Sequence, residues 1–135
     1  MSEPSIFIGT HRIADGKLDE FKRDARELVS VVEREETRLL AFNVYFNEDE
    51  SEVTVVQVHP DADSMLFHMQ VAREHITAST EDQLVTKEIQ IFGAPNEAVR
   101  GMIEQLTQAG VSLSAKPRHF AGFTRLGSEA TAPPA

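Results

Sequence analysis

The chain lacks cysteine and tryptophan altogether and has a single tyrosine among its 135 residues. Without cysteine it can form no disulfide, no thiolate metal site and no cysteine nucleophile. Basic residues are also few: 13 Lys and Arg stand against 22 Asp and Glu, which gives a net charge of −9. A chain this acidic repels phosphate backbones and anionic lipid, so the composition argues against nucleic acid and membrane surfaces as partners.

Long apolar runs are missing as well, and no segment approaches the roughly 18 residues that a membrane-spanning helix needs. The first residues, MSEPSIFIG, lack the basic start and the apolar stretch of a signal peptide, so we expect a cytoplasmic protein. Apolar residues make up 41% and charged residues 26% of the chain, which is typical of a soluble globular protein. The length predicts one domain.

What is present is a regular succession of strand and helix patterns. Four runs rich in β-branched and aromatic residues predict strands over 5–13, 38–47, 52–59 and 86–92. Apolar residues three and four apart predict helices from 17 to about 36 and from 61 to about 80. The two middle strands are too close in sequence for a crossover, so they form an antiparallel hairpin. This order is the ferredoxin-like βαββαβ arrangement, an α+β fold whose antiparallel sheet carries both helices on one face.

The chain continues past this unit. Apolar residues at helical spacing predict a third helix with Ala98, Val99, Met102, Ile103 and Leu106 along one side. The segment 118–125 is predicted to be a short final strand, and the small, proline-rich residues 127–135 a disordered tail. We therefore expect one domain over 1–126, with a core at 5–92 and an added helix and strand over 93–125.

The hairpin strands do not alternate between apolar and polar residues as a one-sided sheet would. If Asp49 and Glu50 form a two-residue turn, the numbers of paired residues sum to 99. One face then carries Leu40, Phe42, Val44, Phe46, Val53, Val55, Gln57 and His59, and the other Leu39, Ala41, Asn43, Tyr45, Thr54, Val56 and Val58. Both faces are largely apolar, and two helices can cover only one of them. The simplest cover for the open face is a second copy of the sheet, which predicts a homodimer; the alternative is that the third helix or the tail covers it.

Two segments carry a resemblance to a known family. They are IFIGTHRIADGKLDEF, with the first strand, turn and helix, and VTVVQVHPDADSMLFHMQVAREH, with the third strand and second helix. Together they resemble the dimeric α+β barrel superfamily, and within it the antibiotic biosynthesis monooxygenase-like group of the quinol monooxygenase type. The resemblance implies a small pocket between sheet and helices in each subunit. It also implies oxidation of phenolic or quinol substrates by O₂ with no metal or flavin, and a histidine in the second helix, where His68 stands.

His68 is the first candidate for chemistry. It follows Met65 by three residues and precedes Ala72 by four, so it lies on or beside the core-facing side of its helix. A neutral imidazole there can accept a phenolic proton, and the phenolate is the electron-rich species that reacts with O₂. The alternative is a histidine at the edge of the core, bonded to a backbone carbonyl.

Further candidates come from the second strand and the second helix. Asn43 and Tyr45 share one strand face and could orient a substrate oxygen or, equally, bond across a dimer interface. We group these two with His68 as candidate catalytic residues. The candidate substrate-binding residues are Phe42, Met65, Met69 and His75. Because His68 and His75 are about 10.5 Å apart along a helix, they cannot bind one ion together, and we expect no metal site.

These observations favour a cofactor-independent, monooxygenase-like enzyme acting on a small aromatic, quinol or polyketide-like substrate. The alternative is a non-catalytic, dimeric ligand-binding or accessory domain of the same fold. The missing tryptophan, which is typical at the end of the third strand in the family, favours that alternative. A haem-degrading relative is a third and weaker possibility.

Overall fold

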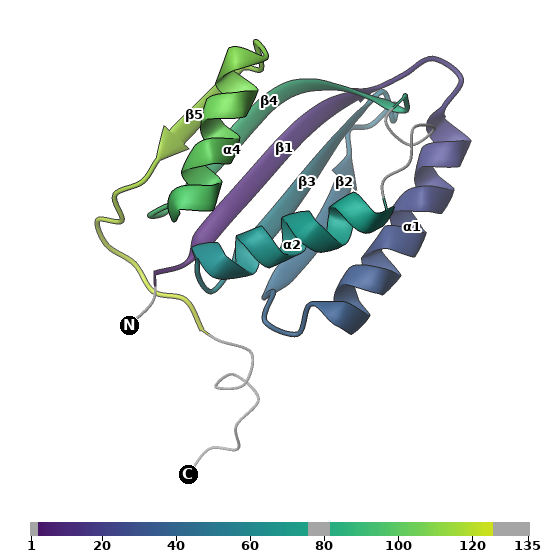
Figure 1. The fold of residues 1–135 in the computed structure, drawn as a ribbon. Coiled ribbons are helices and arrows are strands. Elements are labelled where there is room, and N and C mark those ends of the chain that lie inside the picture. The colour runs from purple at the N-terminus through teal and green to yellow at the C-terminus, as the bar shows by residue number, and fades with distance from the viewer. Residues whose placement is uncertain (1–2, 76–81, 126–135) are drawn as a thin grey trace.

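A single mixed sheet forms the centre of the molecule. The structure is a computed structural model that describes residues 3–75 and 82–125. The strands lie in the order β2-β3-β1-β4-β5 (Figure 1). They are β1 (Ser5–Ile13), β2 (Ala41–Phe46), β3 (Glu52–His59), β4 (Leu84–Phe92) and β5 (Leu113–Lys116). The helices are α1 (Leu18–Glu35), α2 (Ala62–His75) and α4 (Glu97–Gln108).

The first six elements follow the predicted βαββαβ order. β1 runs antiparallel to both β3 and β4, and β2 runs antiparallel to β3. Ala41 pairs with Val58 and Phe46 with Val53, so the partners sum to 99 and the predicted hairpin register is confirmed.

The prediction of a final strand over 118–125 is wrong. The strand is β5, which ends just before Pro117, and residues 118–125 are exposed. Proline has no N–H to donate and a fixed φ, which explains why the strand stops there. β5 pairs parallel with β4 after the α4 crossover, so the sheet is not wholly antiparallel. The predicted tail at 127–135 lies outside the described residues.

All three helices lie on the same side of the sheet, with α2 between α1 and α4 (Figure 1). The helix-facing core is built from Ile13, Phe21 and Val53, with partly buried residues of α1, β2 and β4 packed against them. The third helix therefore does not cover the other sheet face, which corrects one alternative of the sequence analysis. None of the helices in the described part of the chain has the length and hydropathy of a membrane span.

The face of the sheet away from the helices carries a continuous apolar strip. Val58 pairs with Ile6 and Val56 with Ile8 across β3 and β1, and all four side chains are only half-buried. The hydroxyls of Thr10 and Thr54 bond to each other at 3.1 Å near one end of this strip. No segment within residues 3–75 and 82–125 packs over this face as the helices pack over the other (Figure 1).

The turn after β4 depends on Gly93. Its φ is +103°, a conformation that residues with a side chain rarely adopt. A Cβ at this position would overlap the carbonyl oxygen of Pro4, which leads into β1. The Gly93 N–H donates to the carbonyl of Lys116 at 3.0 Å, so one glycine joins β4 to both β1 and β5.

We expect Gly93→Ala to lower the free energy of unfolding by about 2 kcal/mol or more. The strain of a positive φ and the steric overlap with Pro4 both contribute to this loss. Gly101 is the matched control, since it lies inside α4 with open space around its missing Cβ. Gly101→Ala should raise stability by about 0.5–1 kcal/mol through helix propensity. Urea denaturation measures both, and equal effects of the two substitutions would contradict this account of the turn.

Candidate active site

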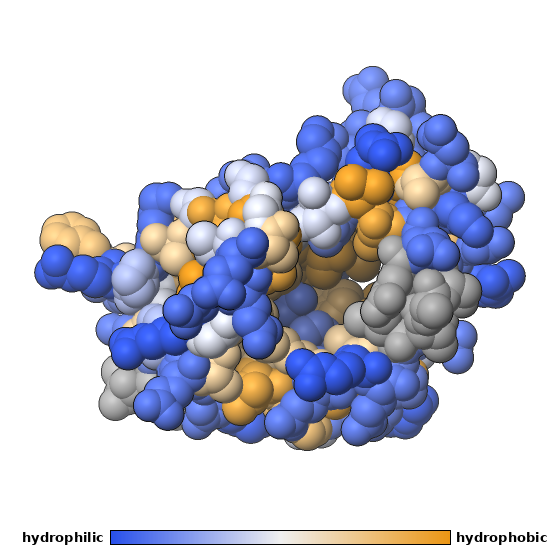
Figure 2. Space-filling model, turned by 45° about the horizontal axis from the view of Figure 1, so that its top comes forward, coloured by the Kyte–Doolittle hydropathy of each residue, from blue (hydrophilic) through white to orange (hydrophobic). Residues whose placement is uncertain are grey.

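A pocket lies between the sheet, α1 and the end of α2. Its volume is about 510 Å³, which is within the range of small-molecule sites. The walls are mainly apolar and comprise Phe21, Ala25, Leu28, Val31, Phe42, Val44, Val55 and Leu84. Figure 2 shows a hollow on one side of the molecule with hydrophobic side chains inside it and hydrophilic ones along part of its rim. The pocket thus suits a ligand with an apolar body.

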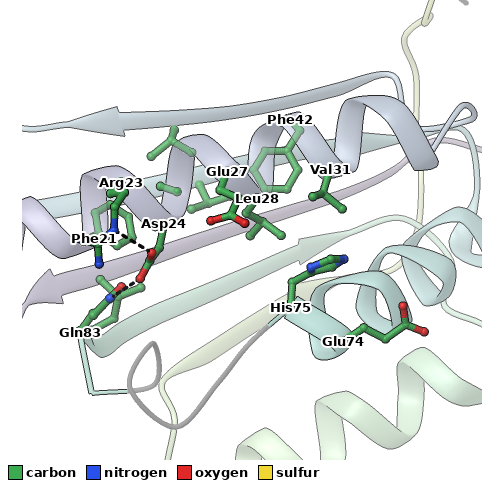
Figure 3. A pocket seen from close by; sticks show the side chains of 14 residues that line it. Phe21, Arg23, Asp24, Glu27, Leu28, Val31, Phe42, Glu74, His75 and Gln83 are labelled. Carbon is green, nitrogen blue, oxygen red and sulfur yellow. Dashed lines mark hydrogen bonds and ion pairs between the residues drawn. The ribbon is translucent and has the colours of Figure 1, made fainter.

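One polar end of the pocket is formed by Asp24 of α1 and Gln83, which precedes β4 (Figure 3). The Gln83 side-chain Nε2 donates to Asp24 Oδ2 at 2.7 Å. Only 1% of Gln83 is exposed, so the donor of this hydrogen bond to the carboxylate is a buried side chain. The other Asp24 oxygen lies 3.5 Å from Arg23 Nε, but that arginine is 72% exposed and the pair is a weak surface contact.

A second polar group in the pocket is His75, at the end of α2. Figure 3 shows its ring extending from α2 toward α1, away from the Asp24–Gln83 end. Its Nε2 lies 3.8 Å from Glu35 Oε2, and 38% of the side chain is exposed. Glu27 and Glu74 also line the pocket, so its charged groups are mostly acidic.

A buried polar cluster lies behind the pocket wall. His68 Nδ1 is 2.8 Å from Glu36 Oε2, and both side chains are almost fully buried. The His68 ring contacts those of Phe42 and His59, with centroids 5.1 and 5.9 Å away. Of these residues only Phe42 lines the pocket, so the phenyl ring separates the pocket from His68.

His59 is fully buried and bonded at both nitrogens. Nε2 lies 3.0 Å from Gln57 Oε1, and Nδ1 lies 2.9 Å from the Ser64 hydroxyl. A carbonyl oxygen can only accept, so a neutral ring with its proton on Nε2 satisfies both bonds. Burial, with a smaller effect of nearby His68, lowers the pKa of His59 to about 3. His59 is therefore a neutral structural residue at physiological pH.

Glu36 is the acidic member of the cluster. Burial raises its pKa, and the neighbouring His68 partly counteracts that effect. Its Oε1 has no hydrogen-bond partner among the described residues. Glu36 and Phe42 also line a smaller pocket of about 240 Å³ at the end of α1.

The start of α2 is held by Asp61. Its Oδ1 accepts the Ser64 N–H at 3.0 Å, and its Oδ2 pairs with Arg38, which precedes β2. The hydrogen bond from Arg38 lowers the pKa of Asp61. This cap stabilises the first turn of α2. Further along the helix His68 contacts Glu36 and His59, and His75, two turns later, lines the pocket.

The three candidate catalytic residues do not form one site within the chain. His68 lies among the helices, whereas Asn43 and Tyr45 project from the opposite face of the sheet, where Tyr45 is 57% exposed. Successive residues of a strand point to opposite faces, so Phe42 and Val44 face the helices and the two polar residues face away. The predicted hairpin register already placed Asn43 and Tyr45 on the face opposite Phe42, but it left open which of the two faces the helices cover.

Two of the four candidate substrate-binding residues line the pocket, and two do not. Phe42 and His75 line the pocket, while Met65 and Met69 are not among its lining residues. Met65 is fully buried and belongs to the core. No group of three or more His, Asp or Glu side chains in the described ranges 3–75 and 82–125 is arranged to hold a metal ion.

Two polar pocket residues were missed by the sequence analysis. Asp24 follows Phe21 by three residues and precedes Leu28 by four, so its spacing placed it on the pocket face of α1. Gln83 carried no such signal, because its partner is 59 positions away in the sequence.

No family model matches the chain, and no curated protein matches it either. Solved structures do match. MupZ from Pseudomonas fluorescens has 16% identity and a TM-score of 0.68, and the match covers 90% of this chain and 91% of MupZ. SnoaB from Streptomyces nogalater, a cofactor-independent oxygenase, has 11% identity and a TM-score of 0.57, with 70% of this chain and 96% of SnoaB covered.

A putative antibiotic biosynthesis monooxygenase from Bacteriodes thetaiotaomicron has 16% identity and a TM-score of 0.56, with 63% of this chain and 84% of that protein covered. The chain therefore has the fold of the antibiotic biosynthesis monooxygenase-like proteins, as its sequence resemblance predicts. Residues after β4 make up 43 of 135 positions, so the match to MupZ must extend into the segment with α4 and β5.

The lowered pKa of His59 predicts a loss of stability in acid. Between pH 6.5 and about 3 the unfolded chain binds a proton at His59 that the folded chain does not, so stability rises with pH there. We expect the free energy of unfolding to fall by up to about 1.4 kcal/mol per pH unit on acidification from this one group. The raised pKa of Glu36 has the opposite effect on the pH dependence of stability. Because Glu36 is present in both proteins compared below, that effect is common to them.

The measurement is urea denaturation from neutral pH to about pH 4, for the wild type and His59→Gln. The variant should show the shallower decline, because it lacks the group that only the unfolded chain protonates. Parallel pH curves for the two proteins would show that His59 is protonated in the folded state.

Proposed function

We propose that the protein is an enzyme that oxidises a small aromatic, quinol or polyketide-like substrate with O₂ and without a cofactor. The observation that carries this proposal is the pocket of about 510 Å³ with apolar walls and a histidine among its lining residues. The fold shared with SnoaB, a cofactor-independent oxygenase, supports the type of reaction. The phenyl rings of Phe21 and Phe42 supply flat apolar surfaces against which an aromatic substrate packs.

In this proposal His75, and not His68, is the catalytic base. His75 is a pocket residue, and an imidazole nitrogen can act as a general base toward a phenolic hydroxyl. Glu35, 3.8 Å away, would stabilise the imidazolium that forms. His68 lies behind Phe42 and has Glu36 as its partner, so it acts on the substrate only by supporting the phenyl ring.

The reaction balances without an added reductant when the substrate itself supplies all four electrons that reduce O₂. Removal of the phenolic proton gives an electron-rich phenolate, which reacts with O₂. Where a ring methylene becomes a carbonyl, one oxygen atom enters the product and the other leaves as water with the two methylene hydrogens. The protein needs only to bind the substrate, accept the first proton and exclude bulk water.

We also propose that a second copy of the chain covers the open sheet face, giving a homodimer. The strip of Ile6, Ile8, Val56 and Val58 supports this, because monomers rarely leave a continuous apolar strip in water. Asn43 and Tyr45 lie on the same face and would meet the partner. They are then interface residues, the reading that the sequence left open for them.

Oxygen uptake on a panel of hydroquinones and anthrones tests the enzymatic proposal. His75→Gln should lower kcat by about 100-fold or more, the usual loss when a general base is removed. His119→Gln is the control, since His119 lies in the exposed segment after β5. Uptake above the protein-free rate that is equal in wild type and His75→Gln would remove His75 from the mechanism. Binding without any uptake would favour the non-catalytic binding domain.

Size-exclusion chromatography with light scattering tests the dimer. The wild type should elute with twice the mass of the chain, and Val56→Glu should elute as a monomer, because it buries a charge in the centre of the interface. Phe67→Glu is the matched control, an exposed apolar residue of α2 on the helix side. A wild-type monomer, or a dimer that survives Val56→Glu, would contradict this assignment.

A further inference from the structure

We propose that Asp24, oriented by Gln83, determines which ligands the pocket accepts: it binds a hydroxyl group on an uncharged, otherwise apolar ligand and rejects anions. This inference rests on the proposed function in taking the same pocket and substrate type. It does not depend on oxygen chemistry, so the two can fail separately. Neither residue takes the proton that passes to His75, because a quinol carries two hydroxyl groups and one of them can bind Asp24 while the other faces His75.

Gln83 is built to hold Asp24 in one orientation. Its backbone carbonyl accepts the Ala14 N–H at 2.8 Å, which ties the residue to the loop after β1. Its side chain is buried, and its Nε2 donates to Asp24 Oδ2 at 2.7 Å. A buried amide donor without an acceptor is unfavourable, so rotation of Asp24 away from Gln83 is opposed. The carboxylate is thereby kept at the pocket wall.

Asp24 retains the capacity to bind a ligand. A carboxylate has acceptor positions for about four hydrogen bonds, and Gln83 occupies one of them. The contact from Arg23 to Oδ1 is long, at 3.5 Å, and comes from an exposed side chain. The Asp24 side chain itself is partly exposed at the pocket. A hydroxyl donor on the ligand can therefore reach it.

The surroundings strengthen that hydrogen bond. Phe21 and Leu28 lie three before and four after Asp24 on α1, and with Leu84 they line the same pocket. Hydrogen bonds to a charged acceptor are the stronger kind, and an apolar setting strengthens them further. A ligand that places an apolar ring on these residues and a hydroxyl on Asp24 gains from both contacts.

The charge of the lining selects against anions. Asp24, Glu27 and Glu74 line the pocket, and Arg23 is the opposing full cation among the described lining residues. The chain as a whole has a net charge of −9, so its electrostatic field also disfavours an approaching anion. An ammonium ligand would meet attraction at the mouth but would lose its hydration against the apolar walls. A neutral hydroxyl needs only one acceptor, and Asp24 supplies it.

Ligand-observed NMR titration tests the inference with four compounds of one shape: 2-naphthol, 2-methylnaphthalene, 2-naphthoate and 2-naphthylmethylamine. For the wild type we expect 2-naphthol to bind about tenfold or more tightly than 2-methylnaphthalene and than 2-naphthoate. Tightest binding by the amine would overturn the choice of a neutral hydroxyl. Absence of saturable 2-naphthol binding would overturn the inference as a whole.

Two near-isosteric variants separate the role of Asp24 from simple charge. Asp24→Asn should abolish the preference for 2-naphthol over 2-methylnaphthalene, because a neutral amide replaces the charged acceptor. Glu27→Gln, the matched control one turn along α1, removes the same charge from the same pocket. It should weaken the exclusion of 2-naphthoate and leave the naphthol preference intact. Equal preferences in the two variants would overturn the role of Asp24.

Gln83→Leu tests the positioning role. It should reduce the naphthol preference as Asp24→Asn does while 2-methylnaphthalene still binds, a pattern that general loss of structure would not produce. An unchanged preference in this variant would overturn the role of Gln83. Oxygen uptake by the same proteins keeps the proposals distinct: selective binding without turnover contradicts the oxygenase function alone, and turnover without selectivity contradicts this inference alone.

Discussion

The alternation of side chains along the β2–β3 hairpin is the constraint on which the rest of the structure depends. Because successive residues of a strand point to opposite faces, the register in which Ala41 pairs with Val58 assigns every hairpin residue to one side. Phe42, Val44 and Val55 therefore face the helices and form a wall of the pocket. The same alternation sends Val56 to the open face. A slip of one residue would exchange the two faces, and the pocket wall and the buried cluster would be lost together.

The helix side of the sheet changes character along its length. Near the pocket it is apolar, and toward the end of β3 it carries Gln57 and His59, both buried. Burial of these polar groups is tolerable because each His59 nitrogen has a partner and the ring stays neutral. The Glu36–His68 pair continues this polar region to α1 and α2. Phe42 stands between the two regions, so the pocket has an apolar wall although a carboxylate and two histidines lie just behind it.

How much of the structure can be predicted from the sequence depends on how far apart in the sequence the interacting residues are. The order of the elements, the hairpin register and the amphipathic α1 were predictable, because each depends on a period of two or of 3.6 residues within a short segment. His75 and Phe42, which the sequence proposed for substrate binding, line the pocket, and their role there stays a prediction. The final strand was misplaced because β5 is short and only weakly apolar, and its pairing with β4 lies outside any local pattern.

The sequence by itself determined that the sheet has two largely apolar faces and that helices lie on one of them, since both follow from local periodicity and chain connectivity. Only the tertiary structure decided which polar residues meet. Glu36 reaches His68 across 32 positions, and Gln83 reaches Asp24 across 59. These contacts depend on how the helices pack over the sheet, which many side chains fix together. No short segment of the sequence contains that information, so the candidate site emerged from the fold and not from a motif.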